Sequence, residues 1–192
     1  MASLLLRVIL RAVLPIINKV HSIAHDIKPL EGSSIISVEI RHHRGCPVQL
    51  EDGCEVKPGD PVIKLHLNNA WIAEGWKSSA GSGMRGFPHG LFYYFKDGLR
   101  LLATEVAQGK HGGIVAVYGW TTFHTNANLL GFEVVDLPNT LRVKLAQLHI
   151  TTLMQAHHIP WLNRPTASHK ALQVKAVWLS RAKLLRIHGS TS

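Results

Sequence analysis

Apolar and polar residues alternate over short stretches in the first half of the chain, a pattern typical of half-buried strands. Ile36, Val38 and Ile40 form one such stretch. In the next, over residues 62–68, Ile63, Leu65 and Leu67 alternate with Val62, Lys64, His66 and Asn68. A strand there would turn an apolar face to the core, and its other face would present a cation, an imidazole and an amide.

Turn residues separate these strands. Asp52-Gly53 follows Val48 and predicts a two-residue hairpin turn. Lys57-Pro-Gly-Asp60 has proline and glycine at the two central positions of a type II turn. The sequence therefore predicts a hairpin and then a tight turn before the strand that ends at Asn68.

The stretch over residues 113–138 predicts a compact crossover. Residues 114–117 are apolar and partly β-branched, as in a buried strand. Thr121 or Thr122 can cap a short helix that runs to Asn128 and stops at Gly131. Residues 132–135 then resume an extended run, so two strands of one sheet are expected here.

Two longer helices flank this crossover. Apolar residues step by three and four from Leu91 to Val106, with Gly98 as an internal weak point costing about 1 kcal/mol relative to alanine. A second helix follows Asn139 or Thr140 as its cap and is traced by Leu141, Leu145, Leu148 and Thr152.

The chain closes with a strand at residues 174–178 and a final helical turn that Ser180 can cap. The predicted fold class is α+β: a mixed, mostly antiparallel sheet with helices packed mainly on one side. One domain over residues 35–189 is expected, preceded by an N-terminal amphipathic helix over residues 1–28.

Residues 4–20 form the most apolar segment. Leu6, Ile9, Val13, Ile16 and Val20 share a helical face. Arg7 and Arg11 interrupt the apolar run, which argues against a spanning helix and against a signal peptide. Two interpretations stay open: a helix docked on its own domain, or a peripheral membrane anchor with arginine at the headgroups.

Composition adds a charge argument. The 192 residues are 46% hydrophobic and 17% charged, with a formal net charge of +9. Such a basic chain suits a phosphate, a nucleotide, a membrane face or nucleic acid, but no known nucleic-acid-binding motif accompanies the charge. Cys46 and Cys54 are expected to be free thiols, which permits a reducing cytoplasm, including the inner face of the membrane.

His66, Asn68 and Asn69 are the first group of candidate functional residues. Histidine can move a proton near neutral pH, and asparagine amides offer paired donors and acceptors to a sugar or amide. The structural alternative is that the two asparagines only turn the chain, while His66 bonds a backbone carbonyl.

The second group, Trp120, Thr121, His124 and Asn126, follows the central strand. Polar residues at the end of such a strand can reach a ligand cleft, although helix capping alone would also explain the threonine. Histidine is abundant, with thirteen residues, but no pair has the context of a known metal motif, so no metal is expected.

Several short landmarks, taken in order, resemble a small bacterial family of uncharacterised domains usually called YkoP-like. They are Leu50-Glu-Asp-Gly53, Lys57-Pro-Gly-Asp60, Leu65-His-Leu-Asn-Asn69, Tyr118-Gly-Trp-Thr121 with His124, Leu130-Gly-Phe132, and Trp178-Leu-Ser180. Some members occur alongside polysaccharide deacetylases. The resemblance implies an accessory or ligand-binding protein of cell-envelope or polysaccharide metabolism, with a small molecule or glycan as its ligand and no cofactor.

A second similarity is to the acyl-CoA-dependent N-acyltransferase (GNAT) superfamily. Its order of strand, glycine-rich phosphate loop, helix, strand, Asn-bearing helix and Gly-Phe strand is matched by Leu65–Asn69, Gly81-Ser-Gly83, the helix from Leu91, residues 114–117, Asn126-Ala127 and Gly131-Phe132. This similarity implies acetyl-CoA or another acyl-CoA as cofactor, with His66 or His124 as the base.

Two departures from the superfamily pattern favour the accessory role. Ser78 stands where that pattern has Gln or Arg, and Pro88 separates the loop from its helix.

Overall fold

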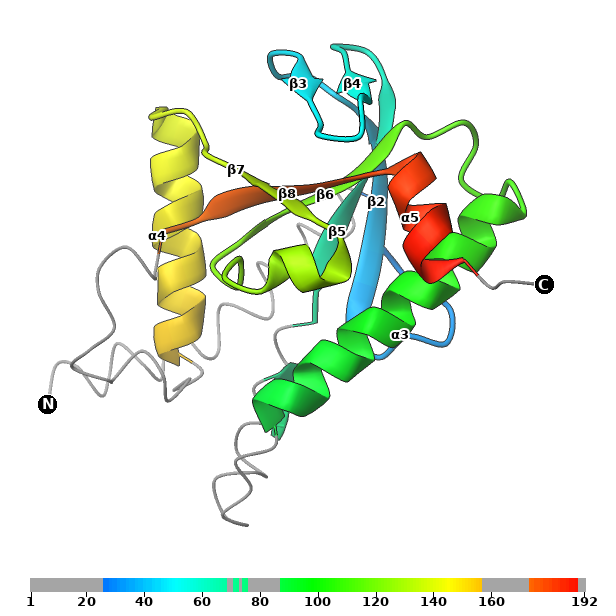
Figure 1. Ribbon diagram of the computed structural model, residues 1–192. Helices are drawn as coiled ribbons and strands as arrows, with labels where there is room; N and C mark the ends of the chain where they lie inside the picture. Colours follow the sequence, from blue (N-terminus) through cyan, green and yellow to red (C-terminus); the bar gives the residue numbers. More distant parts are fainter. Residues whose placement is uncertain (1–25, 69–70, 73, 76–86, 157–172, 190–192) are drawn as a thin grey trace, which may run out of the picture.

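A computed structural model describes residues 26–68, 71–72, 74–75, 87–156 and 173–189 (Figure 1). The predicted N-terminal helix over residues 1–28 lies almost wholly outside this part, and its last residue, Lys28, is in a strand. A six-stranded sheet has the order β1-β2-β5-β6-β8-β7. Its strands are β1 (Lys28–Pro29), β2 (Ile36–His42), β5 (Pro61–Leu67), β6 (Ala116–Thr121), β8 (Lys175–Ser180) and β7 (Glu133–Val135).

Outside this sheet lie the helices α3 (Phe87–Ala107), α4 (Leu141–Ala156) and α5 (Arg181–His188), the 3-10 helix η1 (Ala127–Leu130), and a small hairpin of β3 (Val48–Gln49) and β4 (Glu55–Val56). All pairs of neighbouring strands are antiparallel except β5 and β6. The predicted α+β class and the mostly antiparallel sheet are confirmed.

Each face of the large sheet has its own apolar cluster. On one face α3, α5 and η1 pack against β2, β5, β6 and β8, with Ile63, Val117 and Leu179 fully buried. On the other face the β3–β4 hairpin covers Val62, Ala116 and Trp178. The alternation predicted for β5 is therefore correct, and its even-numbered residues lie on the hairpin side.

β5 and β6 form the parallel pair, and α3 connects them. The paired residues are Val62 with Ala116, Ile63 with Val117 and Lys64 with Tyr118. β5 continues to Leu67 alongside β2, and β6 continues to Thr121 alongside β8. Residues 65–67 and 119–121, which we call the open strand ends, are thus held by their outer neighbours, and Figure 1 shows them diverging.

The hairpin prediction needs one correction. Leu50 N donates to Cys54 O at 2.8 Å and Gln49 faces Glu55, so the loop closed by the Leu50–Cys54 pair has three residues, not two. Gly53 takes a φ of 85° at the third position, a conformation that glycine adopts without a steric cost. The type II turn is confirmed, because Asp60 N donates to Lys57 O at 3.0 Å and Gly59 has a φ of 95°.

The central crossover is partly confirmed. β6 and β7 do belong to one sheet, but β8 lies between them. β6 runs on to Thr121, and the helical turn begins only at Ala127, so the predicted helix from Thr121 or Thr122 to Asn128 is wrong. Gly131 ends the turn as predicted, in the left-handed conformation with a φ of 86°.

α3 begins four residues earlier than predicted. Pro88 lies in its first turn, where the missing N–H costs nothing, so Pro88 opens the helix rather than separating it from the preceding loop. Gly98 is also more than a weak point. A Cβ there would come within 2.5 Å of Ile36 Cδ1, so glycine lets α3 approach β2 closely.

α4 is confirmed as a helix, with Thr140 as its cap: Thr140 Oγ1 accepts from Val143 N at 3.3 Å. Its leucines, however, point away from the core. Leu141, Leu145 and Leu148 are exposed. The helix is attached on another side, where Gln147 Oε1 accepts a hydrogen bond from Val174 N at 2.6 Å.

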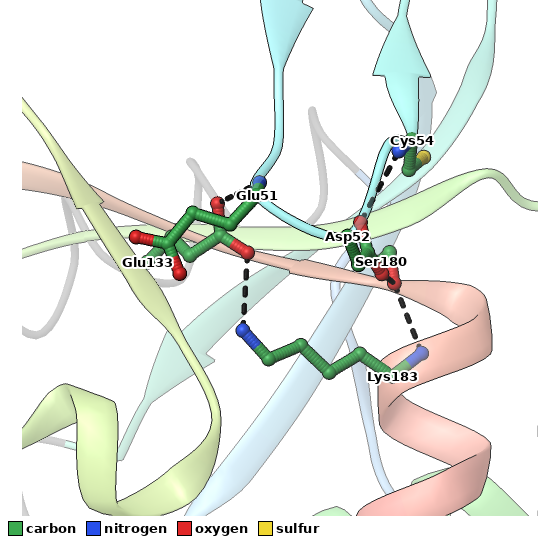
Figure 2. A network of polar contacts seen from close by, with 6 residues as sticks. All are labelled: Glu51, Asp52, Cys54, Glu133, Ser180 and Lys183. Carbon is green, nitrogen blue, oxygen red and sulfur yellow. Dashed lines mark hydrogen bonds and ion pairs between the residues drawn. The ribbon is translucent and has the colours of Figure 1, made fainter.

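A polar network joins the hairpin loop to the end of β8 (Figure 2). The Ser180 hydroxyl donates a hydrogen bond to Asp52 Oδ2, and Ser180 Oγ caps α5 by accepting from Lys183 N at 2.9 Å. Lys183 Nζ reaches Glu133 Oε1 at 3.1 Å, and Glu133 Oε2 accepts from Glu51 N at 2.8 Å. Burial alone would raise the pKa of Asp52, but the Ser180 hydrogen bond and the nearby positive charge hold it below its ordinary value.

Cys46 and Cys54 are free thiols, as predicted. Burial, followed by the charges of Asp52, Asp60 and Glu133, raises the pKa of the Cys54 thiol.

Candidate functional site

A cluster of charged side chains occupies the hairpin-side face of β2 and β5. β2 alternates in the sense Ser37, Glu39, Arg41, and the register sets Glu39 directly opposite Lys64 and Ser37 opposite His66. Alternation then puts Glu39, Arg41, Lys64 and His66 on the same face. Lys64 is in the last residue pair between β5 and β6, and His66 lies beyond it.

Glu39 is the centre of this cluster. Its carboxylate accepts from His66 Nε2 at 2.9 Å and is 3.8 Å from Lys64 Nζ and 3.5 Å from Arg41 Nη1. The Glu39 side chain is only 5% exposed. Burial on its own would raise its pKa, yet the His66 hydrogen bond and the positive charges of Lys64 and Arg41 outweigh burial and lower it. Glu39 is therefore a carboxylate at neutral pH.

A buried carboxylate bonded to one nitrogen of an imidazole fixes the orientation of the ring and stabilises its protonated form. His66 retains 21% exposure of its side chain, so the ring is held from inside and reaches the surface. The arrangement suits proton transfer to or from a group bound at this face.

The open strand ends bring the two predicted groups of residues together in part. Trp120 lies two residues beyond the Lys64–Tyr118 pair on β6, and His66 lies two beyond it on β5, so both belong to the hairpin-side face. The carboxyl ends of parallel strands meet at one edge of a sheet, where α/β proteins commonly bind ligands. Trp71, just after β5, stacks edge-on with Tyr94 of α3 at 4.8 Å, which places the amino-terminal half of α3 at the same edge.

Asn68 is occupied by structural hydrogen bonds. Its Nδ2 donates to Ser34 O at 3.2 Å, and its Oδ1 accepts from Trp71 N at 3.1 Å. Asn68 thus turns the chain after β5, as the structural alternative held, whereas His66 bonds a carboxylate rather than a backbone carbonyl. A ligand-binding role for Asn68 stays a prediction, and Asn69 lies outside the described residues.

The other residues of the second predicted group lie at the end of β6 and in the loop that follows it. Thr121, the last residue of β6, is on the α3-side face by alternation, and its Oγ1 accepts from Phe123 N at 2.9 Å. His124 follows in a loop, where its Nε2 is buried without a hydrogen-bond partner. Asn126 is exposed and precedes η1 without capping it through its side chain. Roles for these three residues at a site stay predictions.

The proposed phosphate-loop glycines, Gly81 and Gly83, lie outside the described residues. Two of the histidine pairs that lack the context of a metal motif, His21 with His25 and His157 with His158, also lie outside the described residues. Within the described ranges, no group of three or more His, Cys, Asp or Glu side chains is arranged to hold a metal ion.

Glu39 is the main functional candidate that sequence reasoning missed. The signal was the polar alternation Ser37, Glu39, Arg41, which shows a strand with one charged face. The partner of that face is 27 residues away in the chain, and only the strand register identifies it as His66.

In the part of the chain that the structure describes, no helix has the length and apolar content needed to cross a bilayer.

Comparisons with known proteins identify the family of the chain. Neither the curated proteins nor the solved structures contain a match to this sequence. A family model, the YkoP domain, matches residues 7–188. Since the match spans nearly the entire sequence and agrees with the landmark segments, the chain belongs to the YkoP domain family.

Proposed function

We propose that the protein binds an acyl-CoA at the open strand ends of β5 and β6 and transfers its acyl group to an amine. The observation that carries this proposal is the strand arrangement. β5 and β6 are parallel, are connected through α3, and pair over only three residues before each follows its outer neighbour. A ligand at the carboxyl ends of β5 and β6 would lie beyond the point where their pairing stops, at the edge of the sheet where α/β proteins commonly bind ligands.

The order of elements supports the same ligand class. β5, α3, β6, η1 with Ala127, and Gly131-Phe132 before β7 follow the order of the acyltransferase similarity. One of the two departures from that pattern is removed, because Pro88 is in the first turn of α3. The first N–H groups of a helix have no partner within it and favour phosphate, which suits the pyrophosphate of an acyl-CoA. The departure at Ser78 remains.

His66 and Glu39 supply the chemistry in this proposal. The amine nitrogen attacks the thioester carbonyl carbon, the C–S bond breaks and the CoA thiolate leaves, while the proton lost by the amine passes to His66. The Glu39 carboxylate, at 2.9 Å from His66 Nε2, would hold the ring and stabilise its charged form. His124 is the alternative base of the same proposal, since its Nε2 is buried without a hydrogen-bond partner.

The acceptor that we propose is an amine of a cell-envelope polysaccharide. Some members of the family that the sequence resembles occur alongside polysaccharide deacetylases. These enzymes remove acetyl groups and leave free amines on the polysaccharide. The second candidate function is an accessory glycan-binding domain without catalysis. The charged face around Glu39, with the aromatic side chain of Trp120 on the same side, favours it, because sugars bind on aromatic and hydrogen-bonding surfaces.

Calorimetry of the full chain with acetyl-CoA tests the proposal. We expect a dissociation constant in the micromolar range. Gly81→Asp and Gly83→Asp should each weaken binding about tenfold, because each places a carboxylate where the phosphates are expected to bind. Gly113→Asp is the matched control: it adds the same charge at the amino end of β6, where a new Cβ meets no atom within 4 Å, and should bind as the wild type does.

Absence of acetyl-CoA binding by a folded wild-type chain would contradict the proposal. Binding of chitosan oligomers in its place would make the accessory role the better explanation. Equal weakening by Gly113→Asp would attribute the effect to net charge and contradict binding at the loop.

A further inference from the structure

α4 presents a row of leucines to solvent. Leu141, Leu145 and Leu148 are 74%, 58% and 64% exposed, and their spacing of four and three residues puts them on one helical face. The helix is fixed with this face outward, because Gln147 is bonded to Val174 at the start of β8 and Thr140 caps the first turn. Figure 1 shows α4 at the side of the molecule away from α3 and α5.

The charge of α4 has one sign. The helix contains Arg142 and Lys144 but no Asp or Glu, and the chain as a whole has a formal net charge of +9. Lys144 is exposed like the leucines near it. An apolar row beside an exposed cation, without anions on the same helix, is a surface that anionic lipid headgroups can contact.

Charge also discriminates among the surfaces that could cover these leucines. Residues 4–20 of the chain are apolar enough, but they contain Arg7, Arg11 and Lys19 and no acidic residue. A second copy of α4 would bring the same cations. Each would add cations and no anions to a surface that already carries Lys144, whereas an anionic lipid surface offers charges of opposite sign.

We propose that α4 is a docking surface for an anionic lipid bilayer. Leu141, Leu145 and Leu148 enter the boundary between headgroups and acyl chains, and Lys144 meets the lipid phosphates. This surface is separate from the predicted contact through residues 4–20 and does not depend on the acyltransferase proposal. It would hold the protein at a membrane with α4 against the lipid.

Vesicle flotation of the full chain tests the inference. We expect binding to vesicles of phosphatidylglycerol and phosphatidylcholine in equal parts, and much less to pure phosphatidylcholine. Binding should fall on addition of about 0.5 M salt. At that ionic strength the Debye length is about 4 Å, so the attraction between the protein and the anionic lipid is screened. The double variant Leu145→Gln, Leu148→Gln should lower the vesicle partition coefficient about tenfold.

Leu129→Gln is the matched control, because Leu129 is a 67% exposed leucine outside α4 and its loss should leave partitioning unchanged. A chain lacking residues 1–20 should still bind through α4. Three results would overturn the inference: binding that the double variant retains, binding that disappears only on removal of residues 1–20, and a wild-type chain that avoids vesicles but loses self-association in the double variant.

Discussion

Replacing Glu39 with alanine is expected to lower the free energy of unfolding by about 3–5 kcal/mol, the cost of removing one partner from a buried charge cluster. Glu39 is the anion that His66, Lys64 and Arg41 share on the face of β2 and β5. Without it, the Lys64 and Arg41 cations and the His66 ring lose the anion that they share on this face. Urea denaturation at neutral pH measures the loss.

Glu55→Gln is the control for this prediction. Glu55 also pairs with a lysine, at 3.3 Å, but its side chain is 44% exposed, so its replacement should cost less than about 1 kcal/mol. Similar losses for Glu39→Ala and Glu55→Gln would contradict the role given to the buried carboxylate.

The Glu39 effect should also depend on pH in a defined direction. The folded protein holds the pKa of Glu39 below its ordinary value of 4.5. A carboxyl whose pKa is depressed by folding stabilises the fold above its unfolded pKa and loses that contribution as the pH falls through the folded pKa. The difference between wild type and Glu39→Ala should therefore be full at pH 7 and shrink below about pH 4.5. A difference that grows on acidification would contradict the lowered pKa.

Ser180→Ala is expected to cost about 2–5 kcal/mol, because one side chain has two structural roles. Its oxygen caps α5 by accepting from Lys183 N, which contributes about 0.5–2 kcal/mol, and its hydroxyl donates to the Asp52 carboxylate, which contributes about 1.5–3 kcal/mol. Ser180 is 1% exposed, so water cannot readily replace it. Thermal and urea unfolding both measure this loss.

Thr140→Ala is the control for this prediction. Thr140 also caps a helix, but it is exposed and has no carboxylate partner in the described structure, so its replacement should lower the free energy of unfolding by about 1 kcal/mol or less. A second measurement separates the roles of Ser180: the pKa of Asp52, followed by carbon NMR, should rise in Ser180→Ala. An unchanged Asp52 pKa would show that the hydroxyl does not hold the hairpin loop.

Sequence rules for turns and helix ends correctly predicted the features that depend only on residues near one another in the chain. Gly131 ended η1, Pro58 and Gly59 built the type II turn, and Ser180 capped α5, since each needs only its neighbours in sequence. The hairpin connection was misjudged by one residue, because the same Asp-Gly pair fits both a two- and a three-residue loop. Continuation of β6 through Thr121 depended on its pairing with Lys175 of β8, which is 54 positions later in the chain.

The candidate site could be predicted only in part for the same reason. The alternation of β5 identified the face of His66, but Glu39 joins it through a register that periodicity does not specify. The leucines of α4 show the converse case. Their spacing predicts a helix correctly, yet spacing cannot tell an apolar face that meets the core from one that meets solvent.

Binding of an acyl-CoA at the open strand ends is tested most directly by NMR chemical shifts of the full chain during titration with acetyl-CoA. We predict the largest changes in backbone amide signals at residues 65–68 and 119–121, with smaller ones at the amino end of α3. Changes confined to the opposite end of the strands, at the carboxyl end of β2 and the amino ends of β5 and β6, would contradict it. So would the absence of any change at about 1 mM acetyl-CoA, because a dissociation constant weaker than that corresponds to less than about 4 kcal/mol of binding free energy.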